Sequence, residues 1–522
     1  MTGGQRILLN TFATYGRTLL AIFLGLFSSR WVLAALGDID YGLMGVVGSI
    51  LVFITFLNSL SSSATSRYFA FSIGQNDVEE TRKWFNSALT FSVLLPATLS
   101  LLGLLGGEIA IRYFLSIPSD RLTTALWVFR FSLITAFITM VCSPFMAMYT
   151  AKQNIAELSL WGISLSLTNF IFVYNLSRFD DNKWLIYSAG ISLISISFTL
   201  MQAWRAHNKY EECKINLKYW FNKKRLKEMV SYSFWTLFGA LGGIFYGNGL
   251  AIVLNKFFPP NIYPSVNASY SIGNTVTGQT QNVSGALLGA FMPEIVTTEG
   301  RGDRNGVIRL VLRASRLSFV IISIIVIPIF FQTDYILTLW LKTPPEYAST
   351  FCRALLIAFL VMKLIGGYDA AICATGKIKK YQLIMSTFSY ATVFMSALLY
   401  WIGFGLFSIC WVIIGYGIIN TLGGVYFGRI IVGIPVKSWL AKVIKPVSIS
   451  LLISFMIGII MQNLLENFSE TTRFFAVTPV LLVTTSLCGW FFLTETSERA
   501  KIKNMIRGFI NKSIRKKELE IS

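Results

Sequence analysis

Two stretches of the chain resemble each other and decide its fold: RFSLITAFITMVCSPFMAMYTAKQNIAEL (130–158) and RALLIAFLVMKLIGGYDAAICATGKIKKYQL (353–383). Each begins with an arginine, continues as an apolar run and reaches a polar turn, which reads TAK at 150–152 and TGK at 375–377. The arginines stand 223 residues apart and the lysines 225. This nearly constant offset predicts that the chain contains two similar halves.

The composition is that of a polytopic membrane protein. Of the 522 residues, 54% are hydrophobic and 13% are charged, whereas soluble domains carry roughly 25% charged residues, and the mean hydropathy is +0.61. The expected fold is all-α: two six-helix bundles, each covering one half, with two further helices appended. Runs long enough to cross about 30 Å of hydrocarbon predict fourteen spans, near 10–36, 42–64, 87–111, 124–147, 158–176, 184–204, 230–254, 266–292, 314–335, 353–373, 381–401, 406–427, 446–465 and 474–493.

The distribution of charge predicts the topology. With the N-terminus inside, the cytoplasmic segments hold 33 lysines and arginines, the outside segments 7 and the spans 5. By the positive-inside rule, both termini are cytoplasmic. The halves then start on the same side, so the repeat is parallel and its substrate site is expected between the halves. The formal net charge of +20 lies in short loops rather than on one soluble face, which argues against nucleic-acid binding.

The predicted division of the chain is an N-terminal bundle over 1–215, a C-terminal bundle over 216–440, two extra helices over 441–494 and a basic cytoplasmic tail over 495–522. No loop is long enough to form a separate soluble domain. The longest loop, 205–229, and the tail contain basic amphipathic stretches. We expect both to anchor at the headgroup level near anionic lipids, with docking of a partner protein as the alternative.

Several kinds of chemistry lack the residues that they need. The six cysteines show no CxxC spacing, so neither a zinc site nor a disulfide framework is expected. The single histidine, His207, lies in a basic loop. No other histidine is available for a Ser-His-Asp triad or for ligation of a metal by imidazole. We therefore expect no catalytic residues, no metal and no cofactor. The first apolar run has no small-residue cleavage site behind it, so it is interpreted as a transmembrane helix.

Short motifs give the chain a family resemblance. They are LGDIDYG at 36–42 after an arginine-containing first helix, the TAK and TGK turns, FMPEI at 291–295 and ILTLWL at 336–341. In this order, and with fourteen spans, they resemble the polysaccharide transporter branch of the MOP flippase superfamily, the O-antigen (Wzx-type) flippases. The resemblance covers essentially the whole chain.

The resemblance implies a V-shaped pair of bundles in the bacterial inner membrane. Such proteins move a polyprenyl-diphosphate-linked oligosaccharide, a repeat unit of O-antigen, capsule or exopolysaccharide, from the cytoplasmic to the outer leaflet. H⁺ or Na⁺ coupling, and contacts with membrane lipids and other polysaccharide assembly proteins, are the associated expectations. The chain departs from lipid II flippases, which carry an arginine cluster where only Arg67 stands here. It also departs from MATE antiporters, which usually have twelve helices and an acidic residue in the first.

Charges inside the spans are the candidate site residues, because a charge at bilayer depth is costly and usually lines a cavity. The cations Arg17, Arg30, Arg130 and Lys363 are expected to form a cationic, substrate-binding cavity. A guanidinium can hold a diphosphate with two parallel hydrogen bonds. The alternatives are a structural bond of Arg17 to backbone carbonyls or to a carboxylate, and snorkelling to the headgroups for Arg30 and Arg130.

Asp369 lies six residues after Lys363, which in a continuous helix sets the two about 120° apart. It is a candidate for binding a coupling proton or Na⁺, with an ion pair as the alternative. The eighth span carries a stripe of polar and small residues: Asn267, Ser271, Asn274, Gly278, Gln281 and Gly285. The stripe is either a polar cavity wall that binds sugar hydroxyls or a helix-packing seam.

Two other functions compete with the flippase. A membrane enzyme of polysaccharide assembly needs a large outer loop or a carboxylate constellation, and the longest outer connection, roughly 336–352, holds only Glu346 as an acidic residue. An ion-coupled exporter of small amphiphiles, as in the MATE branch, would have an acidic cavity rather than a basic one. The expected protein is therefore a flippase and not an enzyme.

Cysteine labelling tests the topology. On a cysteine-free background, single cysteines near Lys223 and Lys517 should be shielded from an impermeant reagent in intact cells, because both positions are expected to be cytoplasmic. A cysteine near Asp181 should be labelled. Labelling near Lys223 from outside would contradict both the topology and the parallel repeat.

Overall fold

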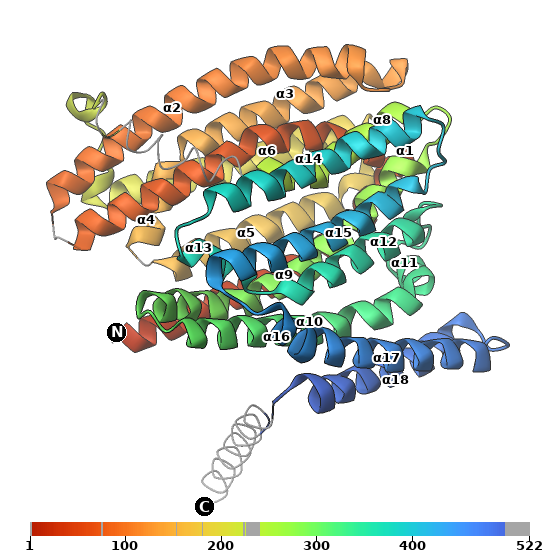
Figure 1. Ribbon diagram of the computed structural model, residues 1–522. Coiled ribbons are helices and arrows are strands. Elements are labelled where there is room, and N and C mark those ends of the chain that lie inside the picture. The colour runs from red at the N-terminus through yellow and green to blue at the C-terminus, as the bar shows by residue number, and fades with distance from the viewer. Residues whose placement is uncertain are drawn as a thin grey trace, which may run out of the picture. The chain divides into compact units, whose positions relative to one another are not determined.

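A computed structural model describes residues 3–74, 77–152, 154–179, 181–222, 225, 241–495 and 499. Over this part of the chain the structure is helical and contains no strand, which confirms the all-α fold class (Figure 1). The expected amphipathic helix near 219–230 lies mostly outside the described residues. The basic tail, apart from Glu495 and Arg499, and the labelling positions Lys223 and Lys517 also lie outside them.

By its contacts the chain divides into two compact units. Unit 1 comprises Met1–Asn274, Leu337–Phe351 and Gln382–Val412. Its helices are α1 (Gly3–Gly74), α2 (Val78–Ile109), α3 (Ser119–Val141), α4 (Ser143–Ala151), α5 (Ile155–Tyr174), α6 (Lys183–Lys209), α8 (Leu250–Phe257), the start of α9 (Ser265–Gly300) and most of α14 (Lys379–Trp401). The expected bundle boundaries, which divide the sequence rather than the contacts, stay a prediction.

Unit 2 comprises Thr275–Ile336, Cys352–Tyr381 and Ile413–Ser522. It holds the rest of α9, then α10 (Arg304–Phe331), α11 (Thr333–Leu341) in part, α12 (Ala348–Met362), α13 (Tyr368–Ala374), most of α15 (Ser408–Phe427), α16 (Val436–Trp439), α17 (Lys445–Leu464) and α18 (Glu470–Cys488). Five-residue π-helical segments continue α15 as η7 (Gly428–Val432), join α16 to α17 as η8 (Leu440–Ile444) and extend α18 as η9 (Gly489–Leu493).

The hairpin of α17 and α18 packs along α10 within unit 2 (Figure 1). Glycines permit the close approach: a Cβ added at Gly458 would lie 2.5 Å from the ring of Phe331, and one added at Gly489 would lie 2.7 Å from Val320. The Gln462 side chain donates a 2.7 Å hydrogen bond to the Phe331 carbonyl. The two extra helices predicted from the sequence are therefore an integral part of this unit.

Eleven helices in the described part of the chain are long and apolar enough to cross a membrane. This is compatible with fourteen spans without confirming that count. One of the eleven, Leu20–Ile50, runs through a break at Gly37 (φ 75°) where two expected spans meet. The expected span 230–254 is only partly described, and α9 is too polar to be counted. The chain is a multi-pass membrane protein.

The LGDIDYG motif forms the sharp turn inside α1. Gly37 provides the positive φ that an L side chain rarely adopts. Asp38 accepts a 2.6 Å hydrogen bond from Ser265, and Asp40 pairs with Arg121 at 3.0 Å. At Gly42, a Cβ would lie 2.9 Å from the backbone nitrogen of Ala268. The motif therefore fixes α1 to the start of α9 within unit 1.

The two repeated stretches break at matching places. In the first, α3 ends at Val141 and α4 begins at Ser143, with Cys142 between them. In the second, α12 passes into a 3₁₀ turn, Lys363–Ile365, and α13 begins after Gly366 and the left-handed Gly367 (φ 87°). Cys142 and Gly366 stand 224 residues apart, within the offset of the repeat. The expected 120° between Lys363 and Asp369 is wrong, because the helix is interrupted between them.

Two glycines of α1 test the seam between α1 and α9. Gly42→Ala should lower stability by about 1–3 kcal/mol, because the added methyl group meets backbone. Gly48→Ala is the matched control, because nothing lies within 4 Å of its added Cβ. Alanine lowers the backbone entropy of the unfolded chain, so this variant should be more stable by roughly 0.5–1 kcal/mol. The midpoint of thermal unfolding in detergent should therefore fall for Gly42→Ala and rise for Gly48→Ala. A shift of the same sign and size in both variants would contradict the seam.

Candidate functional site

The two cations of the first expected span lie in unit 1 on α1. Arg17 is partly buried and lies against α5: a Cβ added at Gly162 would approach the Arg17 Cδ to 2.8 Å. Arg30 is also partly buried. Within the described part of the chain, no carboxylate lies within ion-pair distance of either guanidinium. The structural ion pair considered for Arg17 is therefore not found among these residues.

Lys363 lies in unit 2, in the 3₁₀ turn where α12 ends. Its ammonium group lies over the ring of Phe359, 4.3 Å from the centroid, a cation–π contact that offsets part of the cost of burial. No described carboxylate lies within ion-pair distance of its Nζ. The break in the helix thus places a lysine, without an acidic partner among the described residues, in a segment expected to span the membrane.

Asp369 lies on the far side of the same break, in the first turn of α13. Its carboxylate accepts hydrogen bonds from the Tyr381 hydroxyl and, at 3.9 Å, from the Cys373 thiol. The side chain is exposed in the structure and makes no ion pair with Lys363. Its role in ion coupling stays a prediction.

Arg130 has a partner that the sequence analysis did not identify. Its Nε lies 2.7 Å from Glu108 at the end of α2, and the guanidinium stacks on Trp127. The repeat-related Arg353 does the same in unit 2: it pairs with Asp334 at 2.6 Å and stacks on the Phe330 ring. The signal in the sequence was an acid about twenty residues before each arginine. Substrate contact by Arg130 stays a prediction, but its charge is already neutralised.

The stripe on α9 divides into a packed part and an open part. Asn267 is 3% exposed and lies beside Gly42, while the Ser271 hydroxyl lies 2.4 Å from the Cβ that Gly45 lacks. Asn274 hydrogen-bonds to Tyr270. In unit 2, by contrast, Gln281 is exposed, and a Cβ added at Gly278 or Gly285 would meet nothing within 4 Å. The start of the stripe therefore fits the interpretation as a packing seam. The end of the stripe fits the interpretation as a cavity wall.

These features suit the binding of a polar anion. Guanidinium and ammonium groups without carboxylate partners in apolar spans favour an anionic ligand, and exposed amides such as Gln281 can bind hydroxyl groups. The described residues contain no group of three or more metal-ligating side chains.

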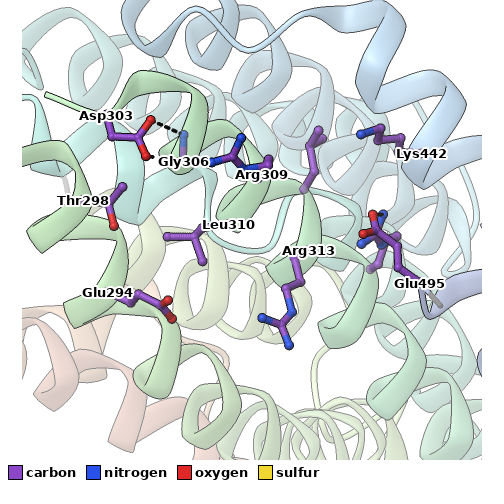
Figure 2. Close-up of a pocket in the computed structure, with 11 residues that line it drawn as sticks. Glu294, Thr298, Asp303, Gly306, Arg309, Leu310, Arg313, Lys442 and Glu495 are labelled. Atoms are coloured by element: carbon purple, nitrogen blue, oxygen red, sulfur yellow. Dashed lines mark hydrogen bonds and ion pairs between the residues drawn. The ribbon is translucent and has the colours of Figure 1, made fainter. Parts of the chain in front are cut away.

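One basic cluster escaped the sequence analysis. Arg309, Arg313 and Arg316 were counted only as topology charges, although their i, i+4, i+7 spacing on one helix face was visible in the sequence. In the structure they line a pocket with Lys442 (Figure 2).

No family model matches the chain. No curated protein matches its sequence either. Among solved structures, the chain is similar to an inward-facing multidrug resistance MATE family transporter of the MOP superfamily, with 15% identity, TM-score 0.66 and coverage of 79% of this chain and 94% of that one. It is also similar to the lipid II flippase MurJ in an inward closed conformation, with 16% identity, TM-score 0.64 and coverage of 92% and 98%.

A third similar structure is a MOP superfamily transporter from Pyrococcus furiosus, whose binding pocket is described as reversed in polarity (14% identity, TM-score 0.60, coverage 82% and 95%). These likenesses confirm that the chain has the fold of MOP superfamily transporters. They do not distinguish the O-antigen branch from the others.

The repeated ion pairs have a testable consequence. Arg130→Gln should lower thermal stability and the amount of inserted protein, because Glu108 loses its 2.7 Å partner in an apolar segment and keeps only Arg112, at 3.9 Å. Glu108→Gln should do the same, and the double variant should recover most of the loss. The Arg353 and Asp334 variants should follow the same pattern. Full additivity of the two single losses in the double variant would contradict a pairwise role.

Proposed function

We propose that the chain is a flippase that moves a polyprenyl-diphosphate-linked oligosaccharide from the cytoplasmic to the outer leaflet of the bacterial inner membrane. The observation that carries the proposal is the pair of span cations, Arg17 and Lys363, that lack acidic partners among the described residues. In the same chain, Arg130 and Arg353 are neutralised by carboxylates. A diphosphate supplies the missing negative charge.

Each part of the proposed substrate has a matching feature. The diphosphate suits a guanidinium, which stays protonated at any depth and binds phosphate oxygens in pairs. The sugars suit the exposed amide of Gln281 and the open face around Gly278 and Gly285. The isoprenoid tail needs no polar partner and stays in lipid. We propose alternating access as the mechanism, with Asp369 as the site of the coupling ion.

The extent of the likenesses supports a flippase over a drug exporter. The flippase MurJ matches 92% of this chain and the MATE transporter 79%. The additional part of this chain that the match to MurJ covers is similar in length to the C-terminal hairpin region, Val436–Leu493. An exporter of cationic amphiphiles would use unpaired acids, whereas Glu108 and Asp334 are occupied by arginines. Asp369 is the feature that favours the exporter, because it is exposed and close to the helix break.

Complementation tests the proposal. In a strain that lacks its own O-antigen flippase, the wild-type chain should restore surface polysaccharide. Arg17→Gln or Lys363→Gln should lower it at least about tenfold, because a charge-assisted contact to the substrate is lost, while the amount of inserted protein is unchanged. Arg17→Lys should restore surface polysaccharide only in part, since an ammonium group lacks the paired donors of a guanidinium.

Matched controls remove an exposed loop cation from the same unit: Lys214→Gln for Arg17 and Lys377→Gln for Lys363. Both should support normal surface polysaccharide. Normal polysaccharide in both test variants, at normal expression, would contradict the role of these cations. A fall in protein level that matches the fall in polysaccharide would assign them to folding instead.

A further inference from the structure

A basic pocket lies in unit 2 where α10 begins (Figure 2). Its volume is about 370 Å³, and its cationic lining consists of Arg309, Arg313, Arg316 and Lys442. The three arginines follow one face of α10, and Lys442 comes from η8. None of the span cations discussed above, nor Arg353, is among the residues that line this pocket.

Carboxylates occupy part of this positive field. Glu495, which follows η9, lies 2.7 Å from an Arg316 guanidinium nitrogen, and Arg316 itself is only 6% exposed. Asp303 caps α10 by accepting from the Gly306 backbone nitrogen and lies 3.9 Å from Arg309. The protein therefore already places an anionic oxygen beside a buried guanidinium in this pocket.

A second cavity of about 320 Å³ adjoins the first, because Arg316, Lys442 and Glu495 line both. It adds one further cation, Lys445, and an apolar wall that includes Ile449 and Phe492. Phe492 is 44% exposed. The first cavity has four cations against three carboxylates, Glu294, Asp303 and Glu495, so its lining has an excess of positive charge. Together the two cavities present this cationic end and an apolar end, the two chemistries of a phospholipid.

The position in the sequence places the pocket at the membrane surface. Three candidate spans, Arg304–Phe331, Val436–Leu464 and Glu470–Leu493, start or end at it. The charged residues that line the pocket belong to the segments expected to be cytoplasmic: 293–316, 428–445 and the tail. Basic pockets between helix ends on this side suit anionic lipid headgroups, which concentrate in the cytoplasmic leaflet.

We propose that this pocket binds the phosphate headgroup of an anionic phospholipid from the cytoplasmic leaflet, with Arg313 and Lys442 as ligands and an acyl chain along Ile449 and Phe492. Glu495 occupies part of the same positive field, so the phosphate competes with it for Arg316. The apolar wall selects a lipid over free phosphate. This inference does not depend on the proposed substrate, and neither Arg17 nor Lys363 takes part.

Lipid binding by the full-length protein tests the inference. The purified chain is titrated in detergent with phosphatidylglycerol or phosphatidylcholine, and lipid occupancy is measured by native mass spectrometry. The wild type should retain phosphatidylglycerol in preference to phosphatidylcholine. Arg313→Gln/Lys442→Gln should weaken phosphatidylglycerol binding at least about tenfold, since each cation near the surface contributes on the order of fivefold. The control Arg429→Gln/Lys437→Gln removes two exposed cations that do not line the cavities, and it should bind as the wild type does.

A variant with the opposite effect separates lost binding from misfolding. Glu495→Gln should tighten phosphatidylglycerol binding on the order of fivefold, because it removes a negative charge that competes with the phosphate. A misfolded protein would not gain affinity. Equal binding by the pocket variant and the control would overturn the proposal.

Two further arms identify the source of the phosphate. Inorganic phosphate at the same concentration should displace little lipid, and equal competition by it would overturn the lipid assignment in favour of a free anion. A polyprenyl diphosphate that binds more tightly than phosphatidylglycerol, and loses its binding in the same pocket variant, would overturn the phospholipid assignment and give the pocket to the transported lipid.

Discussion

The cost of a charge inside the hydrocarbon core is the constraint on which the structure depends. The protein meets this cost in two ways. Arg130 and Arg353 receive carboxylates from neighbouring helices, at repeat-related positions and with the same aromatic stacking. Arg17 and Lys363 have no such partner in the described part of the chain. A charge that the fold does not neutralise needs another source of negative charge, and a transported diphosphate supplies it.

Glycines shape the helices that carry Arg17 and Lys363. Gly37 turns α1 sharply, and Gly42 lets α1 approach the backbone of α9. In the second repeat, Gly366 and Gly367 interrupt the helix between Lys363 and Asp369. The second of these breaks leaves polar backbone groups in an apolar segment, which is tolerated where protein or water covers them. It therefore marks a part of the expected span that faces something other than lipid.

Much of this architecture was predictable from the sequence. Hydropathy and the 223-residue repeat gave the all-α membrane fold, and the short motifs gave the likeness to the MOP superfamily, which the structure neighbours support at the level of the fold. The pairing of Arg130 with Glu108 was missed, because periodicity describes one helix and not its neighbours. The break at Gly366 was missed because an apolar run shows the same hydropathy whether or not it is kinked. The arginines of α10 were visible but were interpreted only as topology signals.

Lipid translocation in proteoliposomes tests the central claim most directly. The purified chain is reconstituted with a polyprenyl-diphosphate oligosaccharide, and accessibility of the glycan to an added glycosidase is followed over time. If span cations without acidic partners serve a diphosphate, the wild type should expose glycan from the inner leaflet and the Arg17→Gln and Lys363→Gln variants should not, although they reconstitute equally. Equal exposure by the wild type and both variants, or exposure no faster than in protein-free vesicles, would contradict the account.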